Sequence, residues 1–128
     1  MRENIVFSDQ AKELAAKARA IADKHVRPGA KKHDRAQEYN WEAARAVADA
    51  GLFRTFIPKE YGGLDAGILA LAMVTEELAK ADSGFGVAFA VNALGSFPIL
   101  VGGTEAQKQR WLPQIARGEK FVAFCLSE

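Results

Sequence analysis

Hydrophobic residues recur at intervals of three and four positions along much of the chain, the spacing that places them on one face of a helix. The first such stretch follows Ser8, a residue suited to capping a helix, and ends at Pro28-Gly29. Further stretches cover 41–50, 67–81, 84–103 and 105–117. The pattern therefore predicts a mainly helical chain, with a polar connection over residues 31–38 between the first two helices.

Polar residues mark several of the predicted helix boundaries. Asn40 and Ser83 are expected to cap the second and fourth helices. The segment Thr104-Glu105-Ala106-Gln107 is a capping box, in which hydroxyl and amide satisfy each other's free backbone N–H groups. On the third helix, the residues predicted to face inward are Ile68, Leu71, Ala72, Leu78 and Ala79.

The remaining apolar stretches do not have helical spacing. Residues 52–58 form an apolar run that predicts extended chain, and Tyr61-Gly62-Gly63 predicts a turn. Phe121–Leu126 is rich in β-branched and aromatic residues, which predicts a strand with Cys125 as a buried, inert thiol. We therefore expect an all-α, up-and-down-like helical bundle of about five or six helices in residues 1–118. Residues 119–128 would follow as the first strand of a truncated β-domain.

No residue from Ser83 to Thr104 is charged, so this stretch passes the length test for a membrane-spanning helix. Glycines interrupt it repeatedly, as do Asn92, Ser96 and Pro98. These interruptions favour a helix buried in a protein core, and we expect no membrane span.

Composition narrows the range of partners. Apolar residues make up 49% of the chain, charged residues 26%, and the net charge is +1 with both signs mixed along the sequence. Such a surface gives no indication of nucleic-acid binding. The single cysteine excludes an internal disulfide, and the first residues do not resemble a targeting leader, so a cytoplasmic location is expected.

Catalytic constellations are scarce in the sequence. His25 and His33 have no cysteine or carboxylate at ligand spacing, so no metal site is expected. Glu76, Glu77 and Glu105 lie on predicted helices. A solvated helix face explains them more simply than a role in acid–base catalysis does. No glycine-rich phosphate loop is present. By these criteria alone, the chain is a helical domain without an assignable reaction.

Several blocks nevertheless resemble the acyl-CoA dehydrogenase family, in order and at similar spacing. The blocks are Ala50-Gly51-Leu52 with Ile57-Pro58-Lys59-Glu60-Tyr61-Gly62-Gly63, then Glu76–Ser83, then Gly103–Lys108 continuing through Trp111-Leu112-Pro113 to Gly118-Glu119, and finally Phe124–Glu128. The last block is similar to the opening of the family's flavin-binding signature. The resemblance covers the chain from about Phe7 onward.

The resemblance implies FAD as cofactor, with Phe124, Leu126 and Ser127 at the isoalloxazine ring. Backbone groups would make these contacts, and the Ser127 hydroxyl would be a further hydrogen-bond partner. In the family, the carboxylate that removes the substrate's α-proton lies in a carboxy-terminal helical domain. No catalytic base is therefore assigned in this chain, which is expected to be the amino-terminal portion of a longer enzyme.

The implied reaction is oxidation of the Cα–Cβ bond of an acyl-CoA thioester to the 2-enoyl-CoA. An electron-transfer flavoprotein would reoxidise the FAD, and the full-length protein would be a homo-oligomer, usually a tetramer in the family. An acyl-CoA oxidase or a flavin monooxygenase on the same fold would share these blocks. A helical interaction module without catalysis is the alternative from another functional class.

The uncharged helix offers candidate substrate contacts. At 100° per residue, Gly86, Ala90 and Leu94 fall on one face with Phe97. By resemblance, this helix lines the acyl end of the substrate pocket, and its small residues would deepen that pocket. Close packing against another helix would also require small residues at these positions, so both interpretations stay open.

Overall fold

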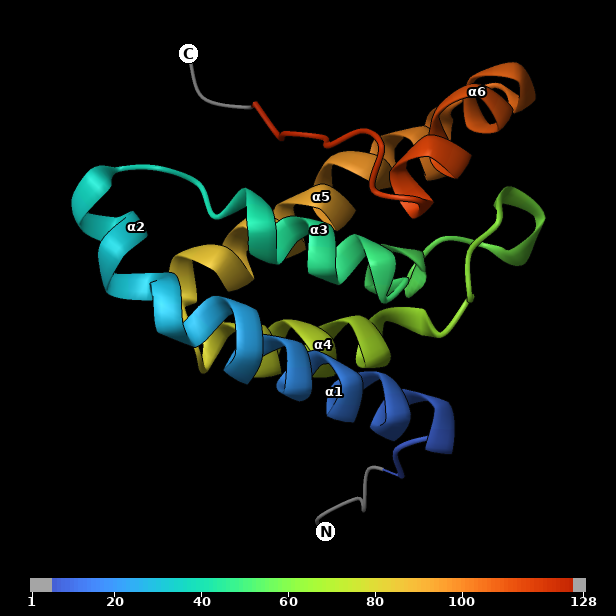
Figure 1. Ribbon diagram of the computed structural model, residues 1–128. Coiled ribbons are helices and arrows are strands. Elements are labelled where there is room, and N and C mark those ends of the chain that lie inside the picture. The colour runs from blue at the N-terminus through green and yellow to red at the C-terminus, as the bar shows by residue number, and fades with distance from the viewer. Residues whose placement is uncertain (1–5, 126–128) are drawn as a thin grey trace, which may run out of the picture.

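The computed structural model describes residues 6–125, and every regular element in that range is helical (Figure 1). The α-helices are α1 (Asp9–Ile21), α2 (Ala30–Ala36), α3 (Trp41–Asp49), α4 (Gly67–Ala79), α5 (Ser83–Gly102) and α6 (Glu105–Ala116). A π-helical turn at Ala22–Val26 and 3₁₀ turns at Arg27–Gly29, Leu52–Arg54 and Lys59–Tyr61 connect them. The predicted all-α class is confirmed.

The helices pack around one apolar core. α1 lies beside α4, α4 packs on α5, and α5 contacts α6. In Figure 1, α1 and α4 lie at the bottom, α3 lies above them, and residues 121–125 pass over the top. The largest fully buried apolar side chains are Phe53, Phe89, Leu52, Ile57, Leu78, Leu112, Ile115, Val26, Val47 and Val74.

The predicted caps are present at three helices, and one is corrected. Ser8 accepts a hydrogen bond from the Ala11 amide, Asn40 caps α3, and the Thr104–Gln107 capping box is complete. At α5 the cap is Asp82, not Ser83. The Asp82 carboxylate accepts from the Phe85 amide at 3.1 Å, and Ser83 is the first helical residue.

Three local expectations were wrong. Residues 31–38 are not a connection, because Ala30–Ala36 forms α2, a helix without a buried residue. Residues 52–58 are not extended, because Leu52–Arg54 closes a 3₁₀ turn. On α4, Ile68 is 61% exposed and Ala72 is also exposed, since the buried stripe consists of Ala70, Leu71, Val74, Glu77 and Leu78.

The predicted turn at Tyr61-Gly62-Gly63 is confirmed, and hydrogen bonds hold it in place. Gly62 has φ +81°, and its carbonyl accepts from Arg54 Nε at 2.8 Å. The amide of Gly63 donates to the Pro58 carbonyl at 3.0 Å. A block that resembles the family therefore builds a compact loop, in which the two glycines serve backbone geometry.

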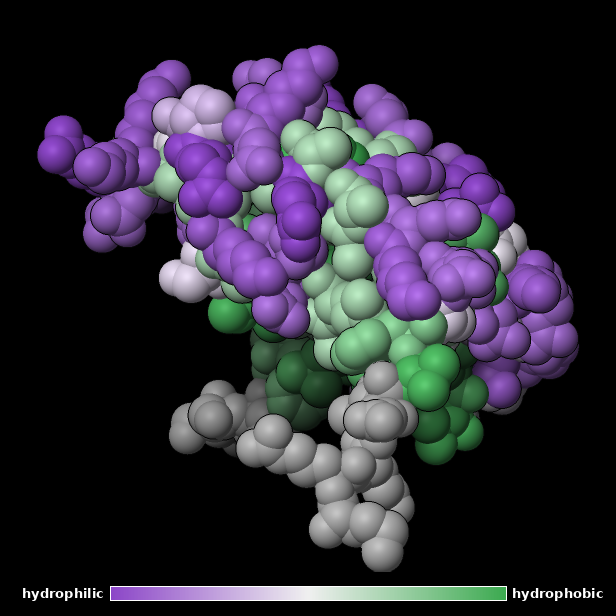
Figure 2. All heavy atoms as spheres, turned by 90° about the horizontal axis from the view of Figure 1, so that it is seen from below, coloured by the Kyte–Doolittle hydropathy of each residue, from purple (hydrophilic) through white to green (hydrophobic). Residues whose placement is uncertain are grey.

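α5 is long and apolar enough to cross a membrane by length and composition alone, with a mean hydropathy of 1.7. In the structure it packs on α4 and α6 and buries Phe85, Phe89 and Asn92 in the core. Exposed apolar residues remain on it, namely Val87, Leu94 and Val101. Figure 2 shows the face seen from below, where hydrophilic side chains cover both sides and a band of hydrophobic residues runs between them.

Candidate functional site

The segment predicted to approach the flavin is anchored on α5. The backbone amide of Val122 donates to Asn92 Oδ1 at 2.7 Å, across 30 positions of sequence. Asn92 is only 1% exposed. The bond therefore joins the middle of α5 to the chain that follows α6.

Gly95 lies one turn further along α5 and gives the same segment room. A Cβ at Gly95 would stand 2.6 Å from Val122 Cγ1 and 3.1 Å from the Ala123 carbonyl oxygen. A side chain at Gly95 would therefore force the segment or the helix to shift. The segment at residues 122–123 thus lies directly on the backbone of α5.

Aromatic packing holds the start of this segment from a different side. The ring of Phe121 meets Trp41 edge-on at a centroid distance of 5.6 Å and Phe53 edge-on at 5.4 Å. Such edge-to-face pairs are the arrangement that aromatic quadrupoles favour. Phe121 and Val122 together define the path of the chain after α6.

The residues after Val122 depart from two expectations. Residues 121–125 form no strand, because a strand requires a hydrogen-bonded neighbour and no other described segment pairs with them. Cys125 is exposed rather than buried. Phe124, a predicted flavin contact, is 45% exposed, while the predicted contacts Leu126 and Ser127 lie outside the described residues.

A cleft of about 540 Å³ opens beside the anchored segment. It runs between the carboxyl end of α5, α6 and residues 120–122, with Pro98, Ile99, Trp111 and Phe121 among its walls. Most of this lining is apolar, and Lys120 supplies one cation. The cleft shares Phe121 and Val122 with the candidate flavin segment.

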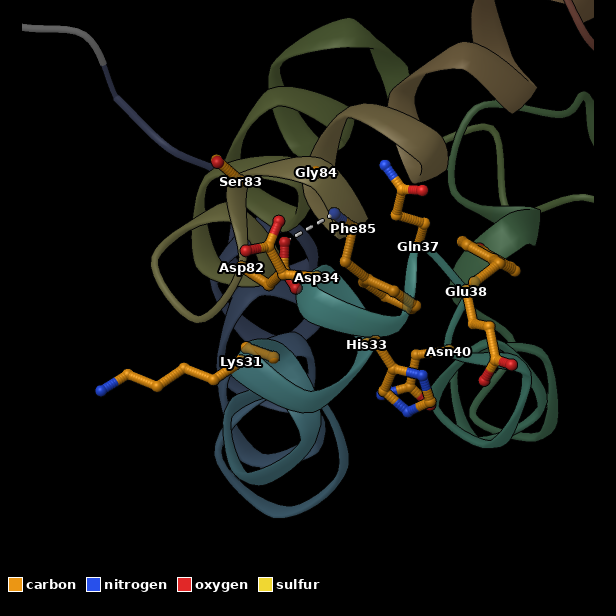
Figure 3. Close-up of a pocket in the computed structure, with 12 residues that line it drawn as sticks. Lys31, His33, Asp34, Gln37, Glu38, Asn40, Asp82, Ser83, Gly84 and Phe85 are labelled. Atoms are coloured by element: carbon orange, nitrogen blue, oxygen red, sulfur yellow. Dashed lines mark hydrogen bonds between the residues drawn. The ribbon is translucent and has the colours of Figure 1, made fainter.

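A second cleft, of about 650 Å³, lies between α2 and the start of α5 (Figure 3). Two of its polar side chains have structural partners: Asp82 caps α5, and Asn40 bonds both the His25 carbonyl and the Ala43 amide. His33 Nδ1 is buried there without a hydrogen-bond partner. None of the predicted site residues lines this cleft.

The three predicted substrate contacts occupy different environments. Gly86 is buried against α4, where a Cβ would stand 2.6 Å from Ala79 Cβ and 2.8 Å from Ala79 Cα. Close helix packing therefore accounts for Gly86, as the alternative interpretation anticipated. Ala90 is half-buried and Leu94 is 44% exposed, and neither lines the two clefts described above.

Glu77 is not on a solvated face, in contrast to the expectation. Its carboxylate is 8% exposed and accepts hydrogen bonds from Arg19 Nε at 2.8 Å and from Lys80 Nζ at 2.8 Å. The Arg19 hydrogen bond, followed by that of Lys80, lowers the pKa of Glu77 to about 2. With this lowered pKa, Glu77 is an anion at neutral pH that ties α4 to α1, which suits structure rather than proton transfer.

Glu105 also has a structural partner. It accepts the hydroxyl of Tyr61 at 2.9 Å, which links α6 to the glycine loop. Burial first, and then this bond, raise the pKa of Tyr61 to about 12. Among the described residues, no group of three or more His, Cys, Asp and Glu side chains is placed to hold a metal ion.

A family model described as the acyl-CoA dehydrogenase N-terminal domain matches residues 8–119, nearly the whole described chain. The chain belongs to the acyl-CoA dehydrogenase family. Among curated relatives, the 3-(aryl)acrylate reductase of Clostridium sporogenes is 34% identical over 123 residues, covering 95% of this chain and 33% of that protein. This chain thus spans about a third of the length of such a relative.

Solved structures show the same arrangement of helices. Butyryl-CoA dehydrogenase from Megasphaera elsdenii matches 93% of this chain and 32% of its own, with a TM-score of 0.85 at 25% identity. An acyl-CoA dehydrogenase from Bacillus anthracis, solved in complex with FAD, matches 95% of this chain and 21% of its own, with a TM-score of 0.82 at 29% identity. The helices of this chain therefore have the fold seen in its family.

The sequence did not single out Asn92 as a functional residue, although the signal was visible. An amide in the middle of an uncharged helix must find a hydrogen-bond partner if that helix is buried. The partner, Val122, lies in the segment that carries the resemblance to the flavin signature. Asn92, Gly95 and residues 121–124 together form the candidate site of this chain.

Proposed function

We propose that residues 1–118 are the amino-terminal helical domain of an FAD-dependent acyl-CoA dehydrogenase and that residues 119–128 begin its middle β-domain. The full-length protein would oxidise the Cα–Cβ bond of an acyl-CoA to give the 2-enoyl-CoA. The observation that carries this proposal is the family match over residues 8–119. The shared fold with a butyryl-CoA dehydrogenase supports it.

The described residues fit an approaching flavin. Beyond Val122 the side chains of Ala123, Phe124 and Cys125 are exposed. Within residues 6–125, Val122 carries the one amide of the 121–125 segment that donates a hydrogen bond to protein. The next amides are therefore available as donors, as required for contacts to the ring's N1–C2=O end, where charge grows on reduction.

FAD would supply the acceptor for the substrate's β-hydride. In this proposal Phe124, Leu126 and Ser127 hold the ring, and Ala90 and Leu94 of α5 face the acyl group. In this proposal the full-length protein is a homo-oligomer in the cytoplasm. Its electron acceptor is an electron-transfer flavoprotein.

Purified full-length protein is expected to contain FAD, and anaerobic addition of an acyl-CoA should bleach its absorption band and yield the 2-enoyl-CoA. Residues 1–128 expressed alone should neither retain FAD nor turn over, because the remaining flavin contacts and the base would be missing. Absorption spectra and product analysis by mass spectrometry measure both. A full-length protein that binds no flavin would refute the dehydrogenase and favour a helical interaction module.

Reduction of an acrylate is a second candidate, favoured by the 34% identity to a 3-(aryl)acrylate reductase. It is the same two-carbon chemistry run in the opposite direction, with the reduced flavin as hydride donor. Reduced full-length protein mixed anaerobically with an arylacrylate, or with its thioester, separates the two directions. Rapid reoxidation by oxygen instead would indicate an acyl-CoA oxidase or a flavin monooxygenase.

Ala90→Phe in the full-length enzyme is expected to lower kcat/KM for the longest accepted acyl-CoA by about tenfold or more while sparing butyryl-CoA. A phenyl ring at a half-buried position would occupy the depth of several methylenes, and each buried methylene contributes about 0.8 kcal/mol. Steady-state kinetics across chain lengths measure this, with Tm as the control for folding. Equal loss at every chain length would show that Ala90 does not contact the acyl group.

A further inference from the structure

We propose that Asn92 and Gly95 form a seat on α5 that positions the flavin-binding segment, and that Asn92 is a positioning residue for the flavin. This inference rests on the proposed function. The seat is defined as Asn92 and Gly95, and the segment as residues 121–124. The family match says nothing about either residue of the seat.

Asn92 is buried, and a buried side-chain amide is energetically costly unless it forms hydrogen bonds. Its side chain is buried at 1% exposure, and its Nδ2 has no hydrogen-bond partner. The orientation of the amide is determined, because the Val122 N–H needs the oxygen facing it. A leucine has the same branched outline and would place no unpaired NH₂ group in the core, so packing alone does not explain an asparagine here.

At Gly95 the segment packs so closely on the backbone of α5 that a Cβ atom would collide with it. Its missing Cβ is the space that Val122 Cγ1 and the Ala123 carbonyl oxygen occupy. Two other glycines of α5 have different surroundings: Gly86 faces Ala79 of α4, and a Cβ at Gly102 would meet nothing within 4 Å. At the fourth glycine of α5, Gly84, a Cβ would stand 3.3 Å from Asp82 Oδ1, so Gly95 alone among the four lies against the segment.

The seat controls the position of Phe124 and the neighbouring amides because it lies close to these proposed flavin contacts. Phe124 follows Val122 by two residues, so it can lie no more than about 7 Å from the bond to Asn92 along the chain. Phe121, held by Trp41 and Phe53, sets the direction from which the chain arrives. Releasing Val122 would leave Phe124 and the amides beside it tethered from one side only.

The test uses the full-length protein with Asn92→Leu, Asn92→Asp and Gly95→Ala. Asn92→Leu removes the acceptor, while Asn92→Asp keeps an oxygen for the Val122 amide. Gly95→Ala pushes on the segment and leaves the helix contacts of α5 unchanged. The controls on the same helix are Gly102→Ala, Gly86→Ala and Ser96→Ala, whose hydroxyl is fully buried but bonds only the Asn92 carbonyl.

We expect Asn92→Leu and Gly95→Ala to speed hydrogen exchange at the Val122 amide by at least about tenfold, the effect of one lost hydrogen bond. In both variants the dissociation constant for FAD should rise by about tenfold, and the flavin spectrum and midpoint potential should shift. Asn92→Asp should retain amide protection at Val122. Gly102→Ala and Ser96→Ala should leave all of these readouts unchanged, and Gly86→Ala should lower Tm without changing the flavin spectrum or potential.

Unchanged exchange and FAD affinity in folded Asn92→Leu would overturn the proposal. So would equal shifts of spectrum and potential in Gly86→Ala and Gly95→Ala, because the effect would then follow from general loosening of α5. If the unaltered protein binds no FAD, the proposed function fails and with it the role toward flavin. Exchange at Val122 then still decides whether Asn92 holds the segment.

Discussion

Gly63→Ala is expected to destabilise the chain by about 3 kcal/mol or more, the largest effect of a single methyl group that we predict. A Cβ at this position would overlap the carbonyl oxygen and carbon of Ile57. That carbonyl cannot move freely, because it accepts the Asp65 amide at 3.0 Å, and the Leu64 amide beside it donates to Arg54 at 2.7 Å. The backbone of the whole loop would have to shift.

Gly62→Ala is the matched control for this substitution. Gly62 has φ +81° but nothing lies within 4 Å of the place a Cβ would take. Its replacement should therefore cost only the strain of a left-handed residue, about 1–2 kcal/mol. Urea denaturation followed by far-UV circular dichroism compares the two. Similar losses for both variants would mean that the loop relaxes around Gly63, contrary to the expected clash.

The sequence predicted helices well where each had a buried stripe and a polar cap. α3 begins after Asn40 and α6 after Thr104 because these side chains satisfy free amides within the next three residues, which is a local interaction. α2 was missed because none of its residues is buried, so no hydrophobic period marks it. A hydrophobic period in the sequence indicates which positions are buried, and an exposed helix has no such period.

Long-range contacts explain most of what the sequence could not show about the site. The hydrogen bond from Val122 to Asn92 spans 30 positions, and that from Arg19 to Glu77 spans 58. No local pattern specifies either partner. A clue was nevertheless available for Glu77, because it occurs at helical spacing from the buried residues Ala70 and Val74. A charged residue on a buried stripe predicts a paired ion.

The strand failed as a prediction for a related reason. Composition describes how residues 121–125 would pack in a sheet, but a strand exists only through its neighbours. The described chain provides a different partner, the side of α5 at Asn92 and Gly95. Within the described residues the segment is therefore positioned by a helix rather than by a sheet, so the candidate site could be identified only from the three-dimensional structure.

Glu77→Gln is expected to cost about 1.5–3 kcal/mol, the range for hydrogen bonds to a charged group. The carboxylate is buried and accepts from both Arg19 and Lys80, so its loss weakens the link between α1 and α4. Glu76→Gln is the control on the same turn. Glu76 pairs with the same Lys80 at 2.9 Å, but its side chain is 65% exposed, and about 0.5 kcal/mol or less is expected.

The same carboxylate should make stability depend on pH in a defined window. The pKa of Glu77 is about 2 in the folded chain, against an ordinary value of 4.5, because Arg19 and then Lys80 favour its charged form. The unfolded chain therefore binds more protons than the folded chain between these values, and the free energy of unfolding rises with pH there. The contribution is complete above pH about 4.5 and is lost as the pH falls toward 2. Urea titrations of unaltered chain and Glu77→Gln at several pH values measure the difference between them, which should shrink on acidification. A difference that stays constant from neutral pH to below pH 3 would show that Glu77 is not held as an anion by Arg19.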